Sequence, residues 1–142
     1  MAFFKTFRRL STSAALRATP NILTTIESNG IATITFNNPS KLNALTEDLG
    51  LQFQSSVQEL ATNSKVRVVI LTGAGTAFSA GGDLQFLEDR TKSSKADNIE
   101  KMKKFYSLYL SIRTLPVPTI AAINGYAVVA PSMLLHRTLC HE

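Results

Sequence analysis

The 142-residue sequence has few of the residues that build metal centres and disulfide frameworks. It contains one cysteine, Cys140, two histidines, His136 and His141, and no tryptophan. A single cysteine excludes an internal disulfide and a cysteine-rich zinc site. Two histidines near the end of the chain provide few potential metal ligands, and we interpret them as surface residues. We therefore predict no metal ligand.

Long apolar runs are also absent. The run at 66–71 is interrupted by Arg67, and it is far shorter than the roughly 18 residues that span a bilayer. We therefore expect no membrane span. Hydrophobic residues make up 44% of the chain and charged residues 18%, with seven glycines and five prolines. This composition is typical of one ordinary globular domain and not of a disordered or fibrous chain.

Acidic residues are missing from the beginning of the chain. The first is Glu27, whereas residues 1–18 contain Lys5, Arg8, Arg9 and Arg17. Beyond this segment, eleven Lys and Arg residues face ten Asp and Glu residues. The net charge of +5 therefore belongs to the N-terminal segment, and it does not indicate a nucleic-acid-binding face.

The same segment has the composition of a targeting sequence. It is rich in Arg, Ser and Ala, and Phe3, Phe7 and Leu10 fall on one helical face. This pattern is typical of a mitochondrial transit peptide, which we predict over residues 1–20 with the matrix as the destination. The alternative interpretation is a plain basic tail.

The rest of the chain alternates between strand and helix patterns. Alternating segments at 22–27 and 31–36 flank Asn29 and Gly30, which predicts a β-hairpin. Thr46 is positioned to cap a helix, and that helix carries a stripe of apolar residues at Leu49, Phe53, Val57 and Leu60.

Later elements are predicted as a strand at 66–72, a surface loop at 92–95, a helix at 97–115 and a strand at 119–123. The apolar face of the 97–115 helix is predicted at Ile99, Met102, Tyr106, Tyr109 and Leu110. The fold class is therefore α/β with a largely parallel sheet.

Two glycines after the 66–72 strand raise the possibility of a dinucleotide-binding loop. Gly73 and Gly75 match the first two glycines of G-x-G-x-x-G, but Phe78 occupies the third position. No second strand ending in an acid follows about 20 residues later. We therefore reject this interpretation.

The segments 76–84 and 116–128 carry most of the functional signal. Each has the pattern of a strand running into a turn, with Gly81-Gly82 in the first turn and Asn124-Gly125 in the second. Such turns can direct free backbone N–H groups into a pocket. Two donors of this kind form an oxyanion hole, which stabilises negative charge developing on a carbonyl oxygen.

These segments, with 38–45 and the 66–72 strand, resemble the crotonase superfamily, the enoyl-CoA hydratase/isomerase proteins. The resemblance covers residues 23–128 and rests on the sequences NPSKLNAL at 38–45, AFSAGGDL at 77–84 and PTIAAINGYAV at 118–128. It implies a crotonase-like ββα spiral fold, of which residues 21–128 would form the N-terminal, acyl-CoA-binding portion. Coenzyme A would be part of the substrate, and no separate cofactor is expected.

The resemblance also implies site residues. The oxyanion donors would be the backbone N–H groups of Gly82 and Ala130. The substrate-binding positions would be Lys41, Leu42, Ala44, Ala80, Gly82, Asp83, Leu84 and Gln85. Hydratase, double-bond isomerase, acyl-CoA hydrolase and decarboxylase reactions share these motifs, so the reaction type stays open.

The sequence departs from the family pattern after Val128. Val129 and Pro131 stand where small, glycine-rich residues are expected, and Met133 stands where hydratases carry their first catalytic acid. We therefore interpret 129–142 as a divergent tail of a truncated chain, without the helices that assemble family trimers or hexamers. A second hypothesis follows: a catalytically inactive form that at most binds coenzyme A or a full-length homologue. Without later strands, the 119–123 strand is expected to be an uncovered edge that lowers solubility.

Overall fold

The computed structural model describes residues 20–128 and 139–141 of the chain. Residues 1–19 of the predicted transit segment and Ala130 lie outside the described residues. No described helix is both long enough and apolar enough to cross a membrane.

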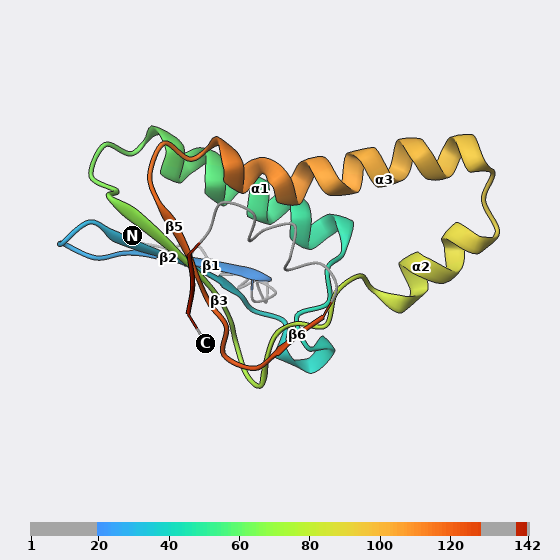
Figure 1. Ribbon diagram of the computed structural model, residues 1–142, viewed down its shortest axis with the longest axis horizontal. Coiled ribbons are helices and arrows are strands. Elements are labelled where there is room, and N and C mark those ends of the chain that lie inside the picture. Colours follow the sequence, from blue (N-terminus) through green and yellow to red (C-terminus); the bar gives the residue numbers. More distant parts are fainter. Residues whose placement is uncertain (1–19, 129–138, 142) are drawn as a thin grey trace, which may run out of the picture.

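A five-stranded sheet organises the fold (Figure 1). Strands β1 (Ile22–Ile26) and β2 (Ile31–Phe36) form the predicted antiparallel hairpin. Strands β3 (Val68–Gly73), β5 (Thr119–Ala122) and β7 (Leu139–His141) then add in parallel, giving the order β1-β2-β3-β5-β7. The prediction of an α/β fold with a largely parallel sheet is confirmed.

Helix α1 (Glu47–Thr62) begins where the sequence predicts. The Thr46 hydroxyl accepts a hydrogen bond from the Leu49 N–H at 3.1 Å, which satisfies one of the free donors of the first turn. The predicted stripe is buried against the sheet and forms much of the core: Leu49, Phe53, Val57 and Leu60.

Helix α3 (Lys95–Leu110) differs from the prediction in its buried face. The predicted Tyr109 is buried and the predicted Met102 packs against the core, but Ile99 and Tyr106 are exposed. Phe105 and Leu108, which were not predicted on this face, are buried. The difference follows from where α3 lies in the fold. Its first half extends past the sheet toward α2 (Leu84–Thr91), while its second half lies beside α1 (Figure 1). The helix is followed by a short 3₁₀ turn, η2 (Ser111–Thr114). The predicted loop at 92–95 is the short corner between α2 and α3, and Lys95 already belongs to α3.

The expectation of an uncovered strand at 119–123 is wrong. Strand β5 pairs in parallel with β3 on one side and with β7 on the other, with Ala121 opposite Cys140. The tail supplies β7, so backbone groups on both sides of β5 enter the sheet. The edge strand on this side of the described sheet is therefore β7 and not β5.

An aromatic row runs through the core between the sheet and the helices. Phe36 packs against Phe53 and Phe78, with ring centroids 5.6 and 5.8 Å apart. Tyr109 stacks on Phe53 at 5.9 Å and donates its hydroxyl to the Thr46 carbonyl at 2.6 Å. Burial raises the pKa of the Tyr109 hydroxyl well above its ordinary value, although the hydrogen bond to Thr46 opposes the shift. The end of α3 is thereby anchored to the start of α1.

Candidate functional site

The candidate site lies beyond the carboxyl ends of the parallel strands β2 and β3. Strand β2 leads into the 3₁₀ turn η1 (Pro39–Lys41), and β3 leads through a turn into β4 (Ala77–Ser79). Open parallel sheets generally bind ligands at this edge, because the loops after neighbouring strands converge there. The two sequence motifs at 38–45 and 77–84 are thus brought side by side.

Asn43 joins these loops from a fully buried position. Its side-chain carbonyl accepts the Asn38 N–H at 2.9 Å, and its amide nitrogen donates to the carbonyls of Ala74 at 2.9 Å and Ala77 at 2.7 Å. Leu42 and Asn43 both adopt the left-handed region, with φ of 49° and 54°. Non-glycine residues rarely take this conformation, and asparagine is among those that tolerate it best. The hydrogen bonds to Asn43 therefore hold the turn in shape.

Ser79 is a second fully buried polar residue, at the end of β4. Its hydroxyl donates to the Asn43 carbonyl at 2.9 Å and accepts the Gly81 N–H at 3.1 Å. Its own carbonyl accepts the Val128 N–H at 2.9 Å, next to the parallel pairing of β4 with β6 (Tyr126–Ala127). Ser79 thus contacts three segments: the 38–45 loop, the glycine turn and the end of the 116–128 segment.

One backbone N–H of the glycine turn, Gly81-Gly82, points away from the 38–45 loop. Leu45 N–H donates to the Gly81 carbonyl at 2.7 Å, and Asp83 N–H donates to the Leu45 carbonyl at 3.1 Å. Because C=O and N–H point in opposite directions across a trans peptide, Gly82 N–H points away from Leu45. Within the part of the chain that the structure describes, this N–H has no hydrogen-bond acceptor.

Two hollows meet at Gly82. One, of about 400 Å³, lies against the 40–44 loop, and the other, of about 310 Å³, lies between the glycine turn and helices α2 and α3. The first is lined by seven of the eight predicted substrate-binding residues: Lys41, Leu42, Ala44, Ala80, Gly82, Asp83 and Leu84. The eighth, Gln85, does not line it, and its side chain donates to Asp89 along α2. Ala130 cannot be placed, because it lies outside the described residues.

The second hollow has an apolar wall that the sequence reasoning missed. The wall comes from α2 and α3 and consists of Phe86, Leu87, Met102, Phe105 and Tyr106. Phe86 stacks on Phe105 with centroids 4.9 Å apart, which joins the two helices. Helix α2 itself was not predicted, although Asp83 caps it by accepting the Phe86 N–H at 3.2 Å. An Asp followed by apolar residues at positions 84 and 87 was the signal that could have revealed it.

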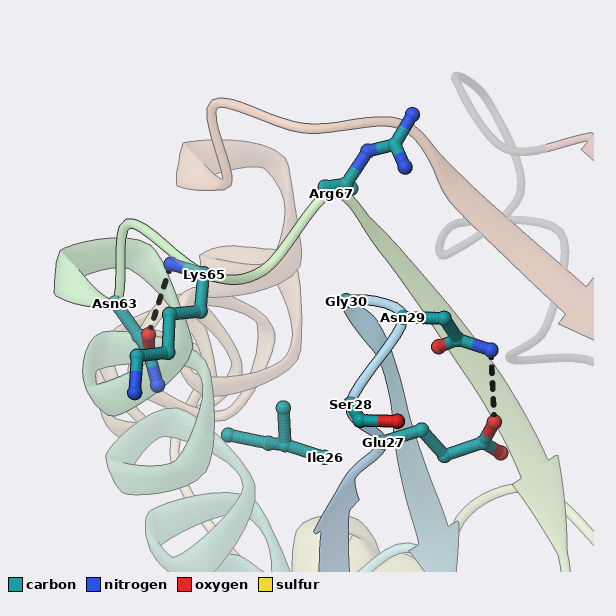
Figure 2. A pocket seen from close by; sticks show the side chains of 8 residues that line it. All are labelled: Ile26, Glu27, Ser28, Asn29, Gly30, Asn63, Lys65 and Arg67. Carbon is teal, nitrogen blue, oxygen red and sulfur yellow. Dashed lines mark hydrogen bonds between the residues drawn. The ribbon is translucent and has the colours of Figure 1, made fainter.

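A third hollow, of about 1000 Å³, lies at the opposite end of β2, between the hairpin turn and the loop after α1. Figure 2 shows that its basic side chains, Lys65 and Arg67, extend in different directions and do not converge on a common point. Its amide groups bond locally, Asn29 to Glu27 and Asn63 to the Lys65 N–H. We therefore do not regard it as the functional site.

No group of three or more His, Cys, Asp or Glu side chains in the described ranges, 20–128 and 139–141, is arranged to hold a metal ion.

Comparison with known proteins agrees with the motifs. The family model of enoyl-CoA hydratase/isomerase matches residues 26–136. A protein of Thermus thermophilus is 37% identical over 103 residues, which cover 72% of this chain and 41% of that protein. The 1,2-epoxyphenylacetyl-CoA isomerase of Escherichia coli is 32% identical over 114 residues, which cover 80% of this chain and 43% of the isomerase.

Solved structures show the same likeness. The crystal structure of an enoyl-CoA hydratase from Polaromonas superposes with a TM-score of 0.73 at 30% identity, over 84% of this chain and 46% of that one. An enoyl-CoA hydratase from Bacillus anthracis gives a TM-score of 0.69 at 30% identity, over 80% and 43%. The chain spans about two fifths of the length of the curated relatives it matches. Its sequence and its crotonase-like fold place it in the enoyl-CoA hydratase/isomerase family, the crotonase superfamily.

Proposed function

We propose that this chain binds acyl-CoA thioesters, and that the thioester carbonyl accepts a hydrogen bond from Gly82 N–H. Two observations carry the proposal: this N–H has no acceptor in the described part of the chain, and Gly82 lines both hollows. Free backbone donors that are held in place in this way are the usual components of an oxyanion hole.

The two hollows suit the two parts of such a ligand. Lys41 and the small residues Ala44 and Ala80 line one hollow; there a lysine ammonium can attract phosphate, and small side chains allow a long ligand to approach the backbone. The apolar wall of α2 and α3 lines the other hollow and would receive the acyl group. The thioester would then lie between them, at Gly82.

The chemistry that follows is stabilisation of an enolate-like intermediate. A second donor would strengthen it, and we propose Ala130 N–H for that role from its position in the motif. Loss of one such donor typically costs about a hundred- to a thousandfold in rate. The hydratase, isomerase, hydrolase and decarboxylase reactions all begin from this polarised carbonyl.

A second candidate function is binding without turnover, to coenzyme A thioesters alone or as a partner of a homologous subunit. The observation that favours it concerns Asp83, the one carboxylate among the described residues that line the two hollows. Its side chain accepts the capping hydrogen bond from Phe86 N–H, which occupies it structurally. General acid–base catalysis needs a carboxylate within reach of the reacting proton.

Calorimetry and a turnover assay test both candidates. Butyryl-CoA should bind saturably to the full chain, and more tightly than butyl-CoA, its thioether analogue without a carbonyl. Absence of butyryl-CoA binding would contradict the proposal. Hydration of crotonyl-CoA would favour an enzyme, and binding without turnover would favour the second candidate. Asn29→Ala, in the hairpin turn, serves as the control and should bind butyryl-CoA normally.

We also propose that the protein acts in the mitochondrial matrix, on the composition of residues 1–20. A fluorescent protein fused behind these residues should enter mitochondria, and a fusion with Arg8 and Arg9 replaced by Glu should not. Uniform cytosolic fluorescence of the first fusion would contradict this.

A further inference from the structure

Ser79 carries a buried hydroxyl beside the glycine turn. It lies two residues before Gly81 and is completely shielded from solvent. One hydroxyl both donates to the Asn43 carbonyl and accepts the Gly81 N–H. Buried polar groups are costly when they lose such partners, so the position of this hydroxyl is closely tied to those of both neighbours.

The turn that it holds is intrinsically permissive. Gly81 has φ of +86°, a region that glycine enters without steric cost, so its backbone has many alternatives. The peptide before Gly81 is fixed by Ser79 Oγ, and the peptide after it is fixed by Leu45 N–H. These two hydrogen bonds, on either side of Gly81, determine where Gly82 N–H points.

Ser79 also bonds to the end of the 116–128 segment. Its carbonyl accepts the Val128 N–H, and Ser79 lies opposite Ala127 in the parallel pairing. The glycine turn and the 126–128 segment are therefore both bonded to this one residue, through its side chain and its backbone respectively.

We propose that Ser79 is a positioning residue: its hydroxyl holds the Gly81 peptide so that Gly82 N–H is directed at the carbonyl of a bound thioester. The inference rests on the proposed function. It assigns Ser79 no contact with the ligand, because Ser79 lines neither hollow. Asn43 supports it by supplying the carbonyl that orients the hydroxyl.

The test separates positioning from general structural damage. Ser79→Ala in the full chain should weaken butyryl-CoA binding by about tenfold. This is the loss expected when the single hydrogen bond between Gly82 N–H and the thioester carbonyl is not made. Binding of butyl-CoA, which has no carbonyl, should stay within about twofold of wild type. Ser111→Ala is the matched control, since it removes a half-buried hydroxyl that donates to the Leu108 carbonyl at the end of α3. It should change neither affinity.

Each outcome has a defined meaning. If wild type binds the two ligands equally, the proposed carbonyl contact fails, and the positioning role fails with it. If wild type prefers the thioester and Ser79→Ala retains that preference, the positioning role alone is refuted. An equal loss of affinity for both ligands would also refute it, because it would indicate general damage.

Should Ser79→Ala not fold, hydrogen exchange in the wild-type chain decides. The Gly81 amide should be protected because Ser79 holds it, and the Gly82 amide should exchange quickly until butyryl-CoA is added. Equally fast exchange at both amides in the free protein would overturn the inference.

Discussion

Replacing Asn43 with alanine should destabilise the protein more than most single substitutions do. The change removes three hydrogen bonds: one from Asn38 N–H, and those to the carbonyls of Ala74 and Ala77. At about 1 kcal/mol for each bond, and about 1 kcal/mol more for placing alanine in the left-handed region, the expected loss is about 4 kcal/mol. Domains of this size unfold with about 5–15 kcal/mol, so the variant should be marginal.

Urea unfolding followed by circular dichroism measures this difference. Asn29→Ala is the control, because Asn29 is also an asparagine in a turn that bonds a backbone N–H, that of Ile31, but it is exposed. It should cost less than about 1 kcal/mol. A loss below about 1 kcal/mol for Asn43→Ala would refute the view that Asn43 holds the site loops together.

Three further predictions concern other parts of the structure. Gly82→Ala should fold nearly as stably as wild type, since its Cβ would meet Leu87 at 3.7 Å, whereas Gly81→Ala, at φ of +86°, should lose about 1–2 kcal/mol; equal losses in thermal unfolding would contradict this. Thr46→Ala should cost about 1 kcal/mol by removing the cap of α1, and an unchanged urea midpoint would argue against it. Above pH about 10 the unfolded chain releases the Tyr109 proton, while burial keeps the pKa of the folded hydroxyl higher. The free energy of unfolding should therefore fall with rising pH by up to about 1.4 kcal/mol per unit, and Tyr109→Phe should lack that part of the decline in a pH series.

The elements that depend on local signals could be predicted from the sequence. Thr46 and the stripe that begins at Leu49 define α1 without any knowledge of the rest of the chain. The hairpin around Asn29 and the parallel strands were predictable for the same reason, because alternation and turn chemistry are local. The motifs at 38–45 and 77–84 likewise indicated residues that the fold brings to one hollow.

Features that depend on tertiary position could not be predicted in this way. The apolar pattern of α3 does not reveal that its first half extends past the sheet, which leaves Ile99 exposed, or that Phe105 stacks on Phe86 of α2. The pairing of β5 with Leu139–His141 is a long-range backbone contact with no local strand pattern to indicate it. The internal partners of Asn43 and Ser79 became visible only when the loops were placed together.

The central claim is that Gly82 N–H donates a hydrogen bond to the carbonyl oxygen of a bound acyl-CoA thioester. The most direct measurement is a titration of the ¹⁵N-labelled full chain, following the Gly82 amide by NMR. Butyryl-CoA should move that resonance downfield to saturation, butyl-CoA should not, and the Asn29 turn should stay unchanged. Binding that leaves the Gly82 amide in place, or that shifts resonances around Lys65 and Arg67 instead, would contradict the account.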